Sequence, residues 1–184
     1  MNTEVKEKVW TYEDYLKLED DKRYEVINGR LVEMPAPTPW HQDISRNLLF
    51  LLWGFVKGKD LGKIYHSPID IVLREDVVLQ PDIVYISKEK LGIVGEKAVN
   101  GTPDLVVEIV SPSTARRDTV VKKGIYENFG VKEYWIVYPD EKAIEVWVLN
   151  ESGKYELYSF AEKEGKVKSK VLEGLEVDLK EVFG

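Results

Sequence analysis

A glutamate in the middle of an apolar segment is the clearest candidate for chemistry in this chain. Glu108 lies in the run of residues 104–111, where aliphatic side chains stand on both sides of it. A segment that is apolar on both faces is typical of a strand covered on both sides. Because an unpaired buried carboxylate is strongly destabilising, we expect Glu108 to have a cation, a metal ion or a proton as its partner.

A lysine in the next segment can be that partner. When residues 113–129 are placed on a helical wheel at about 100° per residue, Val121 and Ile125 define an apolar stripe. Lys122 falls inside this stripe, whereas Arg116 and Lys123 point away from it. The pattern therefore predicts that Lys122 faces the sheet that carries Glu108.

Asp82 adds a second acid. It follows Pro81 at the start of an apolar segment, 81–87. Two acids on neighbouring strands can share one divalent cation, and Mg²⁺ takes carboxylates together with waters and phosphate oxygens. This arrangement suits phosphodiester hydrolysis, with a nearby lysine that orients or deprotonates the attacking water. Asp82, Glu108 and Lys122 therefore predict a site for metal-dependent hydrolysis of a phosphodiester.

Each of these residues also has a purely structural interpretation. Glu108 can form a buried ion pair that only stabilises the fold. Asp82 can accept backbone hydrogen bonds at the start of a strand. Lys122 can extend past Phe129 to solvent. The pattern alone leaves these alternatives open.

Four further residues are candidates for supporting roles. Asp118 has i, i+4 spacing to Lys122 and can hold it in place. His41, near the start of a predicted helix, is either a capping or packing residue or a member of the site. Asp70 either extends the acidic cluster or lies at a turn or sheet edge. Glu25 either supports the site or, as the ordinary explanation has it, is a solvent-facing acid of a hairpin strand.

The first third of the chain predicts a helix, a hairpin and a second helix. Asn28-Gly29 is the strongest short signal for a two-residue turn between two strands. The proline-rich residues 35–39 exclude a helix or a central strand there. The predicted elements are a helix over 11–19, strands over 23–27 and 30–34, and a core helix over 40–57.

The rest of the chain predicts a mixed sheet. Residues 63–73 and 81–87 read as an antiparallel pair joined by a polar turn at 74–76, followed by a mobile surface connection over 87–102. The strand with Glu108, a helix over 113–129 and a strand over 134–138 form a βαβ unit, which implies a parallel pair. The first hairpin is expected in the same sheet, and further strands are expected over 143–150, 154–161 and 167–179.

Composition limits the classes of protein that fit. The chain has 184 residues, 43% of them hydrophobic and 32% charged, which fits one globular domain. Its formal net charge of −7 argues against coating nucleic acid by bulk electrostatics, although a local basic cleft stays possible. The absence of cysteine excludes disulfides and thiol nucleophiles. Apolar runs are too short to span a membrane, and residues 1–10 lack the pattern of a signal peptide, so a cytoplasmic location is expected.

Several segments in this order resemble the PD-(D/E)XK nuclease superfamily and, within it, the Uma two family of restriction-endonuclease-like proteins. The resemblance covers about residues 11 to 160. It is carried by Arg23-Tyr24-Glu25, Asn28-Gly29, His41, Gln80-Pro81-Asp82, residues 107–114, Arg117-Asp118, Lys122, Tyr126 and residues 133–137. The superfamily usually has its lysine two residues after the strand acid, where this chain has Val110. The resemblance implies that Lys122, on the following helix, replaces it.

The resemblance also implies ligands and partners. Asp82 and Glu108, helped by the carbonyl of Ile109, would bind Mg²⁺ or Mn²⁺, and Glu25 and His41 match family positions near the site. Restriction-type nucleases often act as dimers, so a homodimer is expected. No small-molecule organic cofactor is expected.

The sequence thus predicts an α/β restriction-endonuclease-like domain over residues 1–184, with a central mixed, bent sheet flanked by helices. It has an N-terminal helix and hairpin (11–34), a nuclease core (about 40–139) and a C-terminal antiparallel extension (143–184). The predicted function is Mg²⁺-dependent cleavage of DNA by Asp82, Glu108 and Lys122, with Tyr126 and Asp118 supporting the lysine. The alternatives are a non-catalytic module that binds nucleic acid or protein, and a nuclease that acts on RNA.

Overall fold

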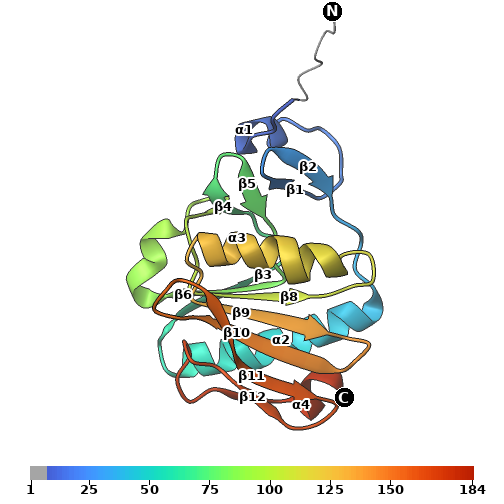
Figure 1. The fold of residues 1–184 in the computed structure, drawn as a ribbon. Coiled ribbons are helices and arrows are strands. Elements are labelled where there is room, and N and C mark those ends of the chain that lie inside the picture. Colours follow the sequence, from blue (N-terminus) through green and yellow to red (C-terminus); the bar gives the residue numbers. More distant parts are fainter. Residues whose placement is uncertain (1–7) are drawn as a thin grey trace, which may run out of the picture.

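The computed structural model describes residues 8–184 (Figure 1). Residues 1–7, which make up most of the segment expected to lack a signal peptide, lie outside the described residues. None of the helices within residues 8–184 combines the length and the apolar character needed to cross a membrane.

A six-stranded sheet forms the centre of the molecule, in the order β11-β10-β9-β8-β6-β3. Its strands β8 and β9 are parallel and all its other neighbours are antiparallel, so the predicted mixed sheet and βαβ unit are confirmed. Helix α2 (Pro39–Gly58) packs on one face and helix α3 (Lys123–Asn128) on the other (Figure 1). The strands are β3 (Gly62–His66), β6 (Ile83–Ser87), β8 (Leu105–Ile109), β9 (Glu133–Tyr138), β10 (Ala143–Leu149) and β11 (Tyr155–Glu162).

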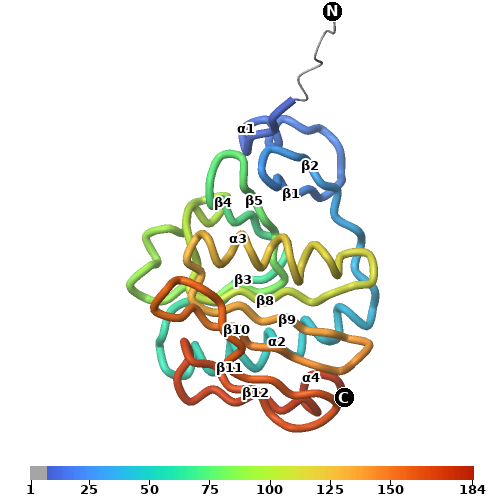
Figure 2. The backbone as a smooth tube through the Cα atoms, in the orientation of Figure 1, coloured from blue at the N-terminus to red at the C-terminus, as the bar shows by residue number. Residues whose placement is uncertain are grey.

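The predicted hairpin is confirmed, but it belongs to a second sheet. Asn28 and Gly29 have φ values of 49° and 76°, which a tight two-residue turn requires. This five-stranded sheet has the order β2-β1-β5-β4-β7, and the hairpin lies beside β4 and β5 at one end of the molecule (Figure 2). Its strands are β1 (Tyr24–Ile27), β2 (Arg30–Glu33), β4 (Ile71–Arg74), β5 (Val77–Leu79) and β7 (Val99–Asn100).

The prediction of one strand over 63–73 is wrong. The segment divides into β3 in the central sheet and β4 in the second sheet, with Pro68 between them. Proline has no backbone N–H for a sheet ladder, which favours a break at this point. The polar turn at 74–76 therefore joins β4 to β5, while β3 pairs antiparallel with β6.

Two other segments differ from prediction. Residues 87–102, expected as a loose connection, form the 3₁₀ helix η1 (Lys88–Ile93) and strand β7, whose Val99 is fully buried. The helix expected over 11–19 is only one turn, α1 (Tyr12–Tyr15), closed at its start by a capping box of Thr11 and Asp14. None of its residues is buried, so packing gives little support to a longer helix.

The helix expected over 113–129 contains a wider turn. Residues Arg117–Lys122 form a π-helix, η2, which continues directly into α3. Hydrogen bonds from i to i+5 place an additional residue in each turn, and such segments are frequent at functional sites. Both Asp118 and Lys122 of η2 are buried.

The C-terminal segment has less strand than predicted. In place of a strand over 167–179, the chain forms a two-stranded sheet of β12 (Lys166–Lys168) and β13 (Glu176–Asp178), followed by helix α4 (Leu179–Phe183). Fully buried Glu133 of β9 connects it to the central sheet. Its carboxylate accepts hydrogen bonds from Trp135 Nε1 (2.7 Å), Ser169 Oγ (2.7 Å), Lys170 N (2.8 Å) and Val171 N (2.8 Å).

Replacing Glu133 by alanine tests this connection. Glu133→Ala leaves the buried donors of Trp135 and Ser169 and two backbone N–H groups without an acceptor, so we expect the free energy of unfolding to fall by about 3–5 kcal/mol. Urea denaturation measures this change. Exposed Glu162 provides the matched control, since Glu162→Ala should change the free energy by less than about 0.5 kcal/mol. Equal effects of the two substitutions would contradict a structural role for Glu133.

Candidate functional site

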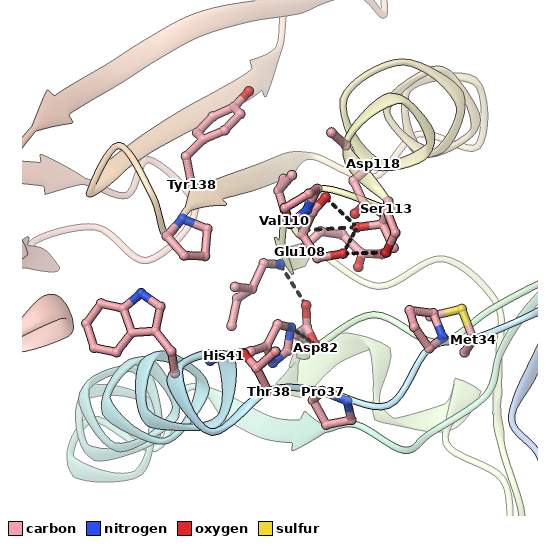
Figure 3. A pocket seen from close by; sticks show the side chains of 18 of the residues that line it. Met34, Pro37, Thr38, His41, Asp82, Glu108, Val110, Ser113, Asp118 and Tyr138 are labelled. Atoms are coloured by element: carbon pink, nitrogen blue, oxygen red, sulfur yellow. Dashed lines mark hydrogen bonds and ion pairs between the residues drawn. The ribbon is translucent and has the colours of Figure 1, made fainter.

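A cavity of about 620 Å³ opens where β8 ends, beside the starts of β6 and α2 (Figure 3). Residues after Met34 and before Pro39 form one wall, and the loop from Ser111 to Ala115 forms another. The charged residues that line the cavity are mainly acidic. They are Asp82, Glu108, Asp118, Asp140, Glu141, Arg23 and Lys122, and His41 lies among them.

Lys122 lies among three carboxylates. Its Nζ is 2.7 Å from Glu25 Oε1, 2.8 Å from Glu108 Oε1 and 3.6 Å from Asp118 Oδ1. Burial acts to lower the pKa of Lys122, but the charges of Glu108, Glu25 and Asp118 outweigh it and raise the pKa above its ordinary value. Lys122 therefore stays protonated at neutral pH, and the alternative that it extends to solvent is wrong, because its exposure is 0%.

Glu108 points from β8 toward the face of the sheet that η2 and α3 cover, as the alternation along the strand requires. Its Oε1 accepts hydrogen bonds from Lys122 Nζ (2.8 Å) and from the Tyr126 hydroxyl (2.9 Å). Burial raises the pKa of Glu108 well above its usual range, Lys122 opposes this, and the charges of Asp118 and Asp82 add to it. The carboxylate is thus destabilised by burial and by its acidic neighbours.

Asp82 lies on the opposite side of the cavity mouth from Asp118, next to His41 (Figure 3). Its Oδ2 accepts a hydrogen bond from the backbone N–H of Ile109 (2.6 Å), and its Oδ1 is 3.3 Å from His41 Nε2. Burial acts to lower the pKa of His41, but Asp82 and the backbone of Ile109 raise it overall. The backbone hydrogen bond joins Asp82 to the residue that follows Glu108, so the two acids occupy the same part of the cavity.

The oxygen atoms available at the site fit a hard divalent cation. Asp82, Glu108 and the carbonyl of Ile109 offer oxygen atoms, which Mg²⁺ and Mn²⁺ prefer. Among residues 8–184, the buried Oε2 of Glu25 has no hydrogen-bond partner, so the site has a hydrogen-bond acceptor without a donor. Within residues 8–184, no cluster of three or more His, Asp or Glu side chains has the geometry to hold a metal ion. Main-chain, water or substrate oxygens would therefore have to complete the coordination.

The structure corrects one interpretation of a supporting residue. Glu25 is not a solvent-facing acid: it is fully buried, and its Oε1 contacts Lys122 and accepts the backbone N–H of Gln80 (2.9 Å). Glu25 is buried because β5 pairs with β1, which places Gln80, directly after β5, against the Glu25 carboxylate. Tyr126, expected to support the lysine, donates its hydroxyl hydrogen bond to Glu108 Oε1, the atom that Lys122 also contacts.

Asp70 belongs to a neighbouring polar group and not to the carboxylates around Lys122. It accepts hydrogen bonds from Gln80 Nε2 (2.8 Å), the Tyr12 hydroxyl (3.4 Å) and the Tyr15 hydroxyl (3.5 Å). Burial raises the pKa of Asp70, and these hydrogen bonds oppose the rise. Gln80 also contacts Arg23, which lines the cavity. Sequence reasoning assigned no role to Arg23 or Gln80, although each stands within two residues of a site acid.

Comparisons with known proteins agree with this fold. A family model described as "Uma2: Putative restriction endonuclease" matches residues 12–180. The chain is similar to the crystal structure of a putative nuclease belonging to DUF820 from Anabaena variabilis, with 20% sequence identity and a TM-score of 0.77. The similarity covers 94% of this chain and 97% of that chain. No curated protein matches the chain. The match over nearly the whole length shows that this chain belongs to the Uma2 family of putative restriction endonucleases.

Proposed function

We propose that the protein is a Mg²⁺- or Mn²⁺-dependent endonuclease that hydrolyses phosphodiester bonds in DNA. The observation that carries this proposal is the 2.8 Å contact between Lys122 of η2 and Glu108 of β8. This contact places a lysine beside Glu108, although Val110 occupies the strand position where the superfamily usually has its lysine. The family match and the nuclease fold support a hydrolase.

In this proposal Asp82, Glu108 and the Ile109 carbonyl hold the metal ion. When bound, the ion supplies Lewis-acid polarisation of the phosphate and a water of lowered pKa. The hydrogen bond from Tyr126 occupies Glu108 Oε1, and the other oxygen has no hydrogen bond to residues 8–184. Tyr126 and Lys122 therefore fix the orientation in which Glu108 presents that second oxygen to the ion.

Lys122 acts through its positive charge and not as a general base. A base would need the neutral amine, but the three carboxylates raise the pKa of Lys122. Because Lys122 is fully buried and Glu25, Glu108 and Asp118 neutralise its charge, the ammonium group acts by holding the Glu108 carboxylate in place. Glu25 and Asp118 are positioning residues, since they hold the lysine at 2.7 Å and 3.6 Å.

The proposal extends to assembly and location. We propose a single-domain protein that acts as a homodimer in the cytoplasm, since cleavage of both strands of a duplex calls for two sites. Its main rival is a non-catalytic binding module with the same fold, which the net charge of −7 favours. A nuclease that acts on RNA would use the same residues.

Cleavage assays with Mg²⁺ or Mn²⁺ test the activity. Plasmid DNA, single-stranded DNA and RNA are incubated with the wild type and with Asp82→Asn and Glu108→Gln. We expect metal-dependent cleavage of DNA by the wild type and a loss of about a hundredfold or more in each variant, because each removes a proposed metal ligand. The enzyme hypothesis is wrong if no substrate is cleaved with either metal. Cleavage of RNA alone would support the alternative of a nuclease that acts on RNA.

Metal binding can be measured without any substrate. A ligand that binds only the folded state at about 100 times its Kd raises the free energy of unfolding by about 2.7 kcal/mol. We therefore expect Mn²⁺ to raise the thermal unfolding temperature of the wild type and to have a much smaller effect on Asp82→Asn. A wild-type protein that is insensitive to Mn²⁺ and Mg²⁺ would count against the proposed metal site.

The charge of Lys122 is also expected to stabilise the fold. Lys122→Met leaves Glu25, Glu108 and Asp118 buried without their cation, so the free energy of unfolding should fall by about 3–5 kcal/mol. Its neighbour Lys123 provides the control, since its Nζ lies 3.0 Å from the centre of the Trp147 ring and outside the site. Lys123→Met should cost about 1 kcal/mol or less. Chemical denaturation compares the two, and similar losses would refute the special role of Lys122.

A further inference from the structure

Arg23 differs from the other charged residues that line the cavity. Lys122, the second Arg or Lys side chain in this lining, is neutralised by three carboxylates. Arg23 has no carboxylate within ion-pair distance among residues 8–184. It is half-buried, just before β1. Burial raises the pKa of nearby Asp70, and the charge of Arg23 opposes this rise without a direct ion pair, so the charge is available to a ligand in the cavity.

Neutral acceptors hold the guanidinium group in place. Arg23 Nε donates to Gln80 Oε1 (3.1 Å), and Arg23 Nη2 donates to Ser67 Oγ (2.7 Å). A guanidinium group has five N–H donors in a planar fork, so these contacts fix its orientation and leave other donors unused. Such a fixed fork matches the geometry of phosphate oxygens.

A second layer of contacts sets the orientation of Gln80. Its side-chain Nε2 donates to Asp70 Oδ1 (2.8 Å) and to the Tyr15 hydroxyl (3.1 Å), which turns Oε1 toward Arg23. Gln80 is 5% exposed, and its backbone N–H donates to Glu25. The residue that holds Arg23 is thus two positions before Asp82 and is attached to the carboxylates around Lys122. Asp70 lies outside the carboxylates around Lys122 because it binds the side-chain amide of Gln80.

We propose that Arg23 binds a phosphate oxygen of the nucleic-acid backbone beside the bond that is cleaved, with Gln80 and Ser67 positioning its guanidinium group. This inference rests on the proposed nuclease function. Asp82, Glu108, Asp118, Asp140 and Glu141 give the cavity lining an excess of negative charge, which repels a polyanion. A fixed, unpaired arginine offsets this repulsion at one defined place. Arg23 is accordingly a substrate-binding residue that does not take part in holding the metal ion.

Binding measurements in an inactive background test the proposal. Glu108→Gln is expected to prevent cleavage, so fluorescence anisotropy in the presence of Mg²⁺ can measure its Kd for labelled single-stranded DNA, duplex DNA and RNA of equal length. Adding Arg23→Gln should raise the Kd by about tenfold or more, because a charge-assisted contact to phosphate is lost. It should also reduce the slope of log Kd against log salt by about 0.7–0.9, the value for one phosphate contact.

Three further variants separate charge, position and folding. Arg23→Lys should keep the salt slope while it weakens binding, since it retains the charge but not the fork. Gln80→Met should also weaken binding with little change in slope. Arg30→Gln is the matched control, because Arg30 is exposed on β2 and does not line the cavity. Thermal unfolding confirms that each variant is folded.

The outcomes distinguish this inference from the function on which it rests. If the Glu108→Gln parent variant binds nucleic acid but the added Arg23→Gln leaves both the Kd and the salt slope unchanged, the role of Arg23 is overturned and the nuclease proposal stands. The role of Arg23 is likewise overturned if Arg23→Lys loses the slope as fully as Arg23→Gln. If the parent binds none of the nucleic acids, and the wild type cleaves none, both proposals fall. The nucleic acid whose Kd changes most with Arg23→Gln, among single-stranded DNA, duplex DNA and RNA, is the one that Arg23 contacts.

Discussion

The buried ammonium group of Lys122 is the interaction on which the arrangement of this molecule depends. Its carboxylate partners come from three different elements: Glu25 from β1, Glu108 from β8 and Asp118 from η2, the helix of the lysine itself. The first belongs to the five-stranded sheet, the second to the six-stranded sheet and the third to the helix that covers it. One side chain therefore joins three elements, and its positive charge compensates the burial of the three acids.

The same interaction leaves a charge imbalance at the cavity. One lysine faces three carboxylates, and Asp82 adds a fourth acid nearby whose closest basic neighbour is His41. Burial raises the pKa of both Glu108 and Asp118, which indicates that their ionised forms are poorly compensated. Placing surplus acids in a partly dry cavity reduces stability, and such costs are common where function requires them. A divalent cation would relieve this imbalance, which is the physical basis of the proposed metal site.

Local patterns in the sequence predicted the parts of the site that lie within one element. Glu108 stands out as an acid in a strand that is apolar on both faces, and Lys122 stands out as a base on an apolar helix stripe. The Asn28-Gly29 hairpin and the βαβ unit follow from equally local signals. Glu25 could not be found in this way, because its burial depends on the pairing of β1 with β5, a contact between distant segments. The π-helix likewise has no distinct sequence signal that separates it from an α-helix.

The position of the lysine on the helix has a structural consequence that a lysine in the strand would not have. Glu108 shares with Val106 and Val110 the face of the sheet that η2 covers, so Lys122 of η2 reaches its carboxylate from above this face. From there Nζ is also within 2.7 Å of Glu25, which brings the second sheet into the site. Asp82 approaches along the sheet instead, through the backbone N–H of Ile109. The positive charge and the second acid therefore reach Glu108 from different directions, and the space between them is the cavity that the loop at Ser111 and the start of α2 enclose.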